Sequence, residues 1–328
     1  MLLKRLKSNN LVNLFLIPLA ILAFWAGNFL APSVYPHARG EADNVLFAPI
    51  FSLTNESPLL SVILSAVLTL LLAFLMELLI SRYQFIRIRT RLPAILYVVL
   101  MGGFGGVHSL HPVYFASIFL LLALFRLFAT FDQAKAYAGL FDVGIFLGIG
   151  SLFYLHLVFL LPAFLAGVLV LSRGTSWRSY FVLVIGFVLP FIFALSYFFF
   201  FDRFQELIDL FVLSMTININ HLANNLSLQV YLGALVFFTI IASIDIAQHY
   251  DSKKVSSRKY FAVLLLVFVF SLAAFILIPA TSQEMLVITT IPVTFLLSNF
   301  FVFLKRRIWG ELLFAVLILF VILLQFWK

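Results

Sequence analysis

The residues best suited to chemistry lie together just after the first apolar run of the chain. His37, Arg39, Glu41 and Asp43 occur there within seven residues. An acid, a base and a cation at one place could bind a metal ion or a phosphate. They could also place a carboxylate as general base beside a substrate. A solvated loop with ordinary charges explains the same residues without any chemistry, and the sequence leaves both interpretations open.

A second polar segment, near residues 202–226, carries Asp202, Arg203, Glu206 and Asp209. Positions 202, 206 and 209 share helical spacing, and apolar side chains occupy the other faces. This pattern predicts an amphipathic helix that lies at a membrane surface. The functional alternative is a lid over a cavity.

Histidines gather on one predicted side of the chain. The turns His108–His111 and Tyr154–His156 each join two apolar runs, so both should lie at the same depth. We therefore expect these histidines to surround one cavity, although His is also common at membrane interfaces without a ligand. No pair has a strong zinc spacing, so a metal is left unassigned. The five histidines of this side are His37, His108, His111, His156 and His221, whereas His249 lies on the other side.

The elements that position these residues are set by an extreme composition. The chain is 64% hydrophobic and 10% charged, with a mean hydropathy of +1.16. Soluble domains carry about 25% charged residues, so this composition excludes a soluble fold. Stretches such as Leu59–Met76 are apolar on every face, which indicates membrane-spanning helices rather than barrel strands.

The apolar runs predict an all-α transmembrane bundle of about eleven helices in one domain, residues 1–328. Long outside loops are expected near 32–57 and 202–226, where function tends to concentrate. There is no cysteine and hence no disulfide framework. The predicted helices are 11–31, 58–81, 92–108, 112–128, 139–155, 157–172, 180–201, 227–247, 260–281, 286–304 and 310–327.

The basic residues predict the orientation of the bundle. If the N-terminus is cytoplasmic, 18 of the 21 Lys and Arg fall in inside segments, and only Arg39, Arg203 and Lys328 fall outside. Such a bias is typical of the positive-inside rule and places the C-terminus outside. The net charge of +8 therefore indicates membrane topology and not nucleic-acid binding. The first apolar run is too long for a signal peptide, so we interpret it as an uncleaved helix.

Two patterns inside the predicted helices concern packing. Arg126 and Asp142 lie at the same end of consecutive helices, where they could form an ion pair. Gly144 and Gly148 are four residues apart, a spacing that lets helix backbones approach closely.

The layout resembles the GT-C class of membrane glycosyltransferases, which use polyprenyl-phosphate sugars. The resemblance depends on an uncleaved first helix, on Gly40-Glu-Ala-Asp43 in the first outside loop, and on the many helices that follow. It implies that Glu41 or Asp43 is the general base that deprotonates an acceptor. It also implies that the lipid phosphate binds at the outside face, where the candidate partners are Arg39, His108, His111 and Arg203.

The chain also resembles an uncharacterised family of Bacteroidetes inner-membrane proteins. This likeness depends on Arg91-Leu-Pro93, on Gly139 to Tyr154, and on Trp177-Arg178 with the following Gly186 and Pro190. It implies a bacterial inner membrane and no particular activity. Two other classes stay open beside the enzyme: a noncatalytic scaffold of a cell-envelope complex with membrane-protein partners, and a lipid or solute carrier. The cofactor is unknown.

Overall fold

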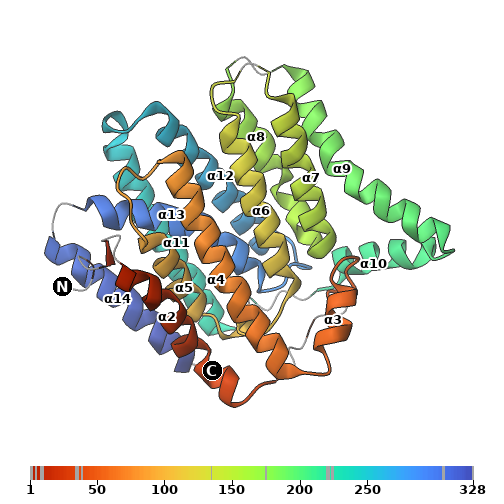
Figure 1. Cartoon of the computed structure of the whole chain (residues 1–328), viewed down its shortest axis with the longest axis horizontal. Helices are drawn as coiled ribbons and strands as arrows, with labels where there is room; N and C mark the ends of the chain where they lie inside the picture. The colour runs from red at the N-terminus through yellow and green to blue at the C-terminus, as the bar shows by residue number, and fades with distance from the viewer. Residues whose placement is uncertain are drawn as a thin grey trace.

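The computed structural model describes residues 3, 6–7, 11–33, 37, 40–133, 135–173, 176–218, 222, 225–304 and 307–326. Within these residues it is helical and contains no strand, which confirms the predicted all-α class (Figure 1). The α-helices are α2 (Leu11–Leu30), α3 (Ala48–Thr54), α4 (Pro58–Tyr83), α5 (Leu92–Gly102), α6 (Pro112–Ala129), α7 (Tyr137–Phe153), α8 (Leu161–Leu171), α9 (Trp177–Phe200), α10 (Phe204–Thr216), α11 (Leu226–Gln248), α12 (Val255–Leu277), α13 (Met285–Phe303) and α14 (Arg307–Phe326). Short 3-10 helices are η1 (Gly105–Val107), η2 (Leu155–Leu160) and η4 (Tyr250–Ser252).

Eight of the described helices are long and apolar enough to cross a membrane, which supports an integral membrane protein. They are α2, α4, α6, α9, α11, α12, α13 and α14. The other three predicted crossings are shorter: α5, α7, and η2 followed by α8. The helix predicted over 92–108 ends at Gly102, where a run of glycines favours the tighter turn η1. The 11 residues of α5 rise about 17 Å, roughly half the hydrocarbon thickness.

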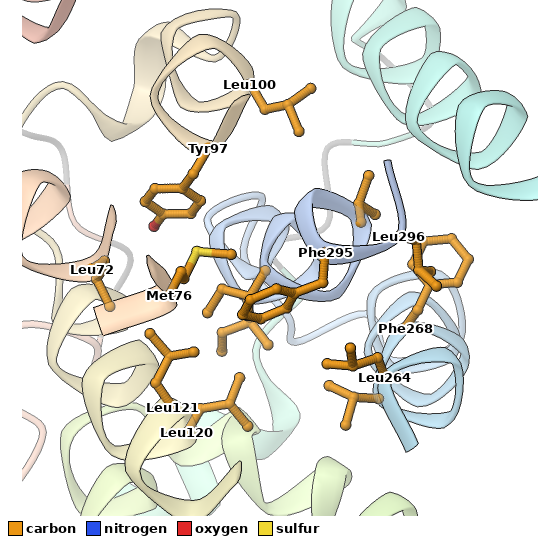
Figure 2. Close-up of a cluster of buried hydrophobic side chains, with 14 of the residues drawn as sticks. Leu72, Met76, Tyr97, Leu100, Leu120, Leu121, Leu264, Phe268, Phe295 and Leu296 are labelled. Atoms are coloured by element: carbon orange, nitrogen blue, oxygen red, sulfur yellow. The ribbon is translucent and has the colours of Figure 1, made fainter. Parts of the chain in front are cut away.

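Helix α13 forms the centre of the bundle. Every residue from Met285 to Val302 is buried, although the helix carries several hydroxyl groups. The hydroxyls of Thr289, Thr290, Thr294 and Ser298 each donate to the carbonyl four residues earlier. Each of these buried hydroxyls therefore has an acceptor within its own helix. Figure 2 shows Phe295 of α13 among side chains from α4, α5, α6 and α12, including Met76, Tyr97, Leu121 and Leu264.

Helices α7 and α9 pack backbone against backbone. A Cβ atom at Gly144 would overlap the carbonyl oxygen of Leu183, and one at Gly148 would overlap that of Phe187. Small residues allow such contacts in membrane bundles, as the Gly144–Gly148 spacing predicted. The predicted ion pair at the start of α7 is also confirmed, because Arg126 Nε lies 3.2 Å from Asp142 Oδ2.

The flanks of the bundle differ strongly from its centre. Only 22% of the residues in the apolar stretch of α2 are buried inside the protein, and 28% of those in α9 and in α14. In α13 the buried share is 94%. The exposed apolar faces of these outer helices therefore contact lipid. Figure 1 shows α9 at one flank, from which it leads directly into α10, the surface helix predicted in the second loop. The short helix α3 lies at the same end of the molecule.

Candidate functional site

The loop after α2 turns its two acidic residues in different directions. Gly40 has a φ of +89°, a conformation that residues with a side chain rarely adopt. Leu213 and Ser214 of α10 pack directly against it. The turn that follows buries Glu41, which is 4% exposed, while Asp43 faces outward. Two acids separated by one residue thus lie in two environments.

Glu41 belongs to a buried cluster of ionisable side chains. Its Oε2 lies 3.3 Å from Nε2 of His111, and Oε2 of Glu284 lies 4.0 Å from the same nitrogen. The ring of His37 stacks on that of His111, with centroids 5.5 Å apart. His111 precedes α6, and its Nδ1 accepts the Val113 N–H at 3.2 Å. The start of α6 therefore fixes the ring that organises the cluster.

Further polar residues surround the cluster from the end of α7. The Tyr154 ring contacts that of His111 at 5.9 Å, and the His156 ring lies 5.1 Å from Tyr154. The Tyr154 hydroxyl shares a 3.0 Å hydrogen bond with Ser282, two residues before Glu284. The two tight turns thus bring His111 and His156 to the same side chain, Tyr154, whereas the expected cavity around the histidines is not found in the large cavity described below, which none of the described histidines lines.

Burial and neighbouring charges shift the pKa values of the cluster in different directions. Burial disfavours the charged form of Glu41, but the His111 ring, its hydrogen bond, a hydrogen bond from Ser282 and the His156 ring together lower the pKa of Glu41 to about 2. Burial and the nearby His111 lower the pKa of His37 to about 4, against the opposite effect of Glu41. Burial raises the pKa of Glu284 to about 8. These shifts favour an ionised Glu41, a neutral His37 and a protonated Glu284 at neutral pH.

A large apolar cavity, which we call the groove, lies on the other side of the loop. Its volume is about 1250 Å³, large enough for a substantial ligand. Helices α7 and α9 supply most of the apolar wall, through residues such as Ile149 and Phe193. Helix α10, the start of α3 and the residues just before it, Val45 and Leu46, supply the remainder. The charged residues that line the groove are Asp43, Arg203, Glu206 and Asp209.

The groove and the buried cluster share their walls. Leu213 of α10 lines the groove and also packs on Gly40, beside Glu41. Leu46 and Leu152 line the groove as well, and the Leu46 N–H donates to the Leu152 carbonyl at 3.3 Å. Helix α10 therefore covers the cluster with one part and borders the groove with another.

The remaining predicted site residues are found in other surroundings. The His108 ring packs at a tilt of 37° against that of Trp25 of α2, with centroids 4.1 Å apart, so its surroundings differ from those of His111. Its backbone oxygen accepts a 3.0 Å hydrogen bond from Ser65, which fixes the turn against α4. Arg203 pairs with Glu206, the Nη2–Oε2 distance being 2.6 Å. Arg39 and His221 lie outside the described residues.

Sequence reasoning missed Glu284 and Tyr154. Glu284 directly precedes an apolar run, a position where an acid commonly begins a helix, so nothing distinguished it. The one sequence feature that could have marked Tyr154 as a site residue is its position two residues before His156, in the same predicted turn.

Comparison with known proteins identifies a family without an assigned activity. The model of DUF6427, a family of unknown function, matches residues 44–328, so the chain belongs to this family. Neither a curated protein nor a solved structure matches the chain. The match begins directly after Asp43. It contains His111, Tyr154 and Glu284, whereas His37 and Glu41 precede it.

Proposed function

We propose that this protein is a membrane enzyme that transfers a sugar from a polyprenyl-phosphate donor to an acceptor, with Asp43 as general base. The observation that carries the proposal is the position of Asp43 and Arg203 on the lining of a large apolar groove. Such a groove suits a lipid chain, and Arg203, which pairs with Glu206 in this structure, is a cation on its lining that can turn to the phosphate of a lipid-linked substrate. The layout likeness to GT-C enzymes supports the sugar as the transferred group.

The chemistry assigned to these residues is a substitution at the sugar carbon. Asp43 removes the proton from the acceptor hydroxyl, and the acceptor oxygen forms the new bond to that carbon. The bond between the carbon and the phosphate oxygen breaks, and its electron pair leaves with the polyprenyl phosphate. Arg203 stabilises the departing phosphate as a cationic donor. The proton ends on Asp43, so one exposed carboxylate suffices for the step.

Glu41 is less suited to the role of base than Asp43. It is buried in contact with His111, whereas Asp43 is exposed on the groove. A base must reach the proton that it removes, at a distance of about 3 Å. The two acids therefore have separate roles, which their environments determine.

A complementation experiment tests the role of Asp43. Asp43→Asn should fail to restore the phenotype of a gene deletion, because general bases contribute about 10²- to 10⁴-fold to rate. Glu56→Gln is the matched control, since Glu56 is an exposed acid that follows α3 in the same outside loop and does not line the groove.

Both variants should reach wild-type levels in the membrane, as measured by quantitative blotting. Full complementation by Asp43→Asn would remove the catalytic assignment and favour a noncatalytic scaffold. In a carrier, the variant would instead alter uptake or lipid distribution without changing any glycosylated product.

A further inference from the structure

We propose that His37, Glu41 and His111 bind one divalent metal ion, and that Zn²⁺ matches their chemistry best. One ligand atom from each residue lies within 4.8 Å of the other two. Two imidazoles and one carboxylate are a ligand set of catalytic zinc sites, which keep a further position for water or substrate. The 4.8 Å separates ligand atoms from one another, whereas zinc requires about 2 Å between the ion and each ligand atom. Modest side-chain adjustment brings the three ligand atoms close enough to share one ion at that bond length.

A second observation points to a bound ion independently of this spacing. Glu284 is 1% exposed, and in the described part of the chain its Oε1 has no hydrogen-bond partner. Its other oxygen lies 4.0 Å from His111 Nε2, so the side chain reaches into the same cluster. Buried polar groups normally have partners, because an apolar setting offers nothing that replaces their lost hydrogen bonds to water. A metal-bound water beside Glu284 supplies the missing partner.

His156 provides the same kind of evidence on another side of the cluster. It is 2% exposed and lies close to the backbone of Ser214, yet neither ring nitrogen has a hydrogen bond of ordinary geometry among the described residues. Its ring contacts Tyr154, which in turn contacts His111. Buried polar groups around one point are typical of a site whose occupant completes their hydrogen bonds.

The hydrogen bond by which His111 caps α6 opposes metal binding, because it fixes where the ring carries its proton. Nδ1 of His111 accepts the Val113 N–H at 3.2 Å, which in a neutral ring places the proton on Nε2. Binding through Nε2 moves that proton to Nδ1 and gives up the single hydrogen bond that caps α6. Zinc binding to several protein ligands contributes far more to stability than one helix cap, so loss of the cap does not prevent it.

This inference does not depend on the proposed transfer reaction. Metal content is measured without any substrate, and Asp43, the proposed base, is not one of the three ligands. Asp43→Asn should therefore lose the phenotype and keep the metal. Failure of one proposal leaves the other standing, and the two results are distinguishable.

The test is metal analysis of the full chain purified in mild detergent from zinc-supplemented cells. Plasma mass spectrometry should find roughly one Zn²⁺ per wild-type chain. Glu41→Gln and His111→Gln should each retain less than about a tenth of that amount, because each removes a ligand. Asp43→Asn and His249→Gln are the matched controls and should retain the wild-type amount.

A second measurement separates lost binding from misfolding. After chelation, added Zn²⁺ should raise the unfolding temperature of wild-type protein and of Asp43→Asn, because the ion binds only the folded state. Glu284→Gln should still respond but require about 10- to 100-fold more Zn²⁺, as expected of an outer partner. The proposal is overturned if stripped wild-type protein does not respond to Zn²⁺, or if Glu41→Gln responds like the wild type.

Discussion

Glu41 and Asp43 are separated by a single residue, yet only one of them is accessible to a substrate. The positive φ of Gly40 and the contact of α10 with it turn Glu41 into the protein and leave Asp43 on the groove. Both acids were predictable as candidates, because charge is otherwise scarce on that side of the chain. Their different environments were not, because they depend on a helix that follows more than 150 residues later in the sequence.

The Tyr154 hydroxyl is expected to contribute to stability by joining the end of α7 to the segment before α13. Tyr154→Phe removes its hydrogen bond and leaves the buried Ser282 hydroxyl without this partner. The free energy of unfolding in mixed micelles should fall by about 1–3 kcal/mol. Tyr197→Phe changes an exposed tyrosine and should stay within about 0.5 kcal/mol of the wild type. Equal effects of the two substitutions would show that the Tyr154 bond contributes nothing.

The pair α7 and α9 forms one wall of the groove, and its shape depends on glycine. The Gly144–Gly148 spacing predicted close packing, and the structure confirms it against Leu183 and Phe187.

The ends of helices were harder to predict than their packing. The run around Gly102 and Gly106 has the hydropathy of a helix, but its glycines favour a turn over further helical residues.

A Gly→Ala substitution should lower the free energy of unfolding at the α7–α9 contact and raise it at Gly233, where the new methyl group has open space. Gly144→Ala forces the backbones apart, so the unfolding free energy should fall by about 1–3 kcal/mol. In Gly233→Ala the new methyl group meets nothing within 4 Å, and the higher helix propensity of Ala should add about 0.5–1 kcal/mol. Thermal unfolding of both variants measures the difference. A stabilised Gly144→Ala protein would contradict the close contact.

The whole molecule is a helical bundle with a buried central helix and lipid-facing flanks. Hydropathy predicted its class, because a segment with apolar side chains on every face can cross a membrane as a helix, which satisfies its own backbone N–H and C=O groups. It did not reveal the central place of α13, whose sequence is no more apolar than that of its neighbours. A helix surrounded by other helices and a helix surrounded by lipid both need apolar side chains. Hydropathy therefore cannot show which helix is buried at the centre of the bundle.

Topology can be tested directly because the chain has no cysteine of its own. Asn55→Cys and Ser252→Cys introduce single thiols at exposed positions on opposite predicted sides. In intact cells, a membrane-impermeant maleimide should label Asn55→Cys and spare Ser252→Cys until the membrane is opened. The reverse pattern would invert the orientation inferred from Lys and Arg.

The central claim is that the groove holds the lipid chain of the substrate, and photolabelling tests it most directly. A polyprenyl phosphate with a photoreactive group in its chain is added to the purified full-length protein, and the modified residues are identified by mass spectrometry. Labels are expected on the groove walls, at residues such as Ile149 of α7 and Phe193 of α9, and excess unlabelled polyprenyl phosphate should prevent them. Labels spread evenly over the lipid-facing flanks, including α14, and insensitive to that competitor would contradict the claim.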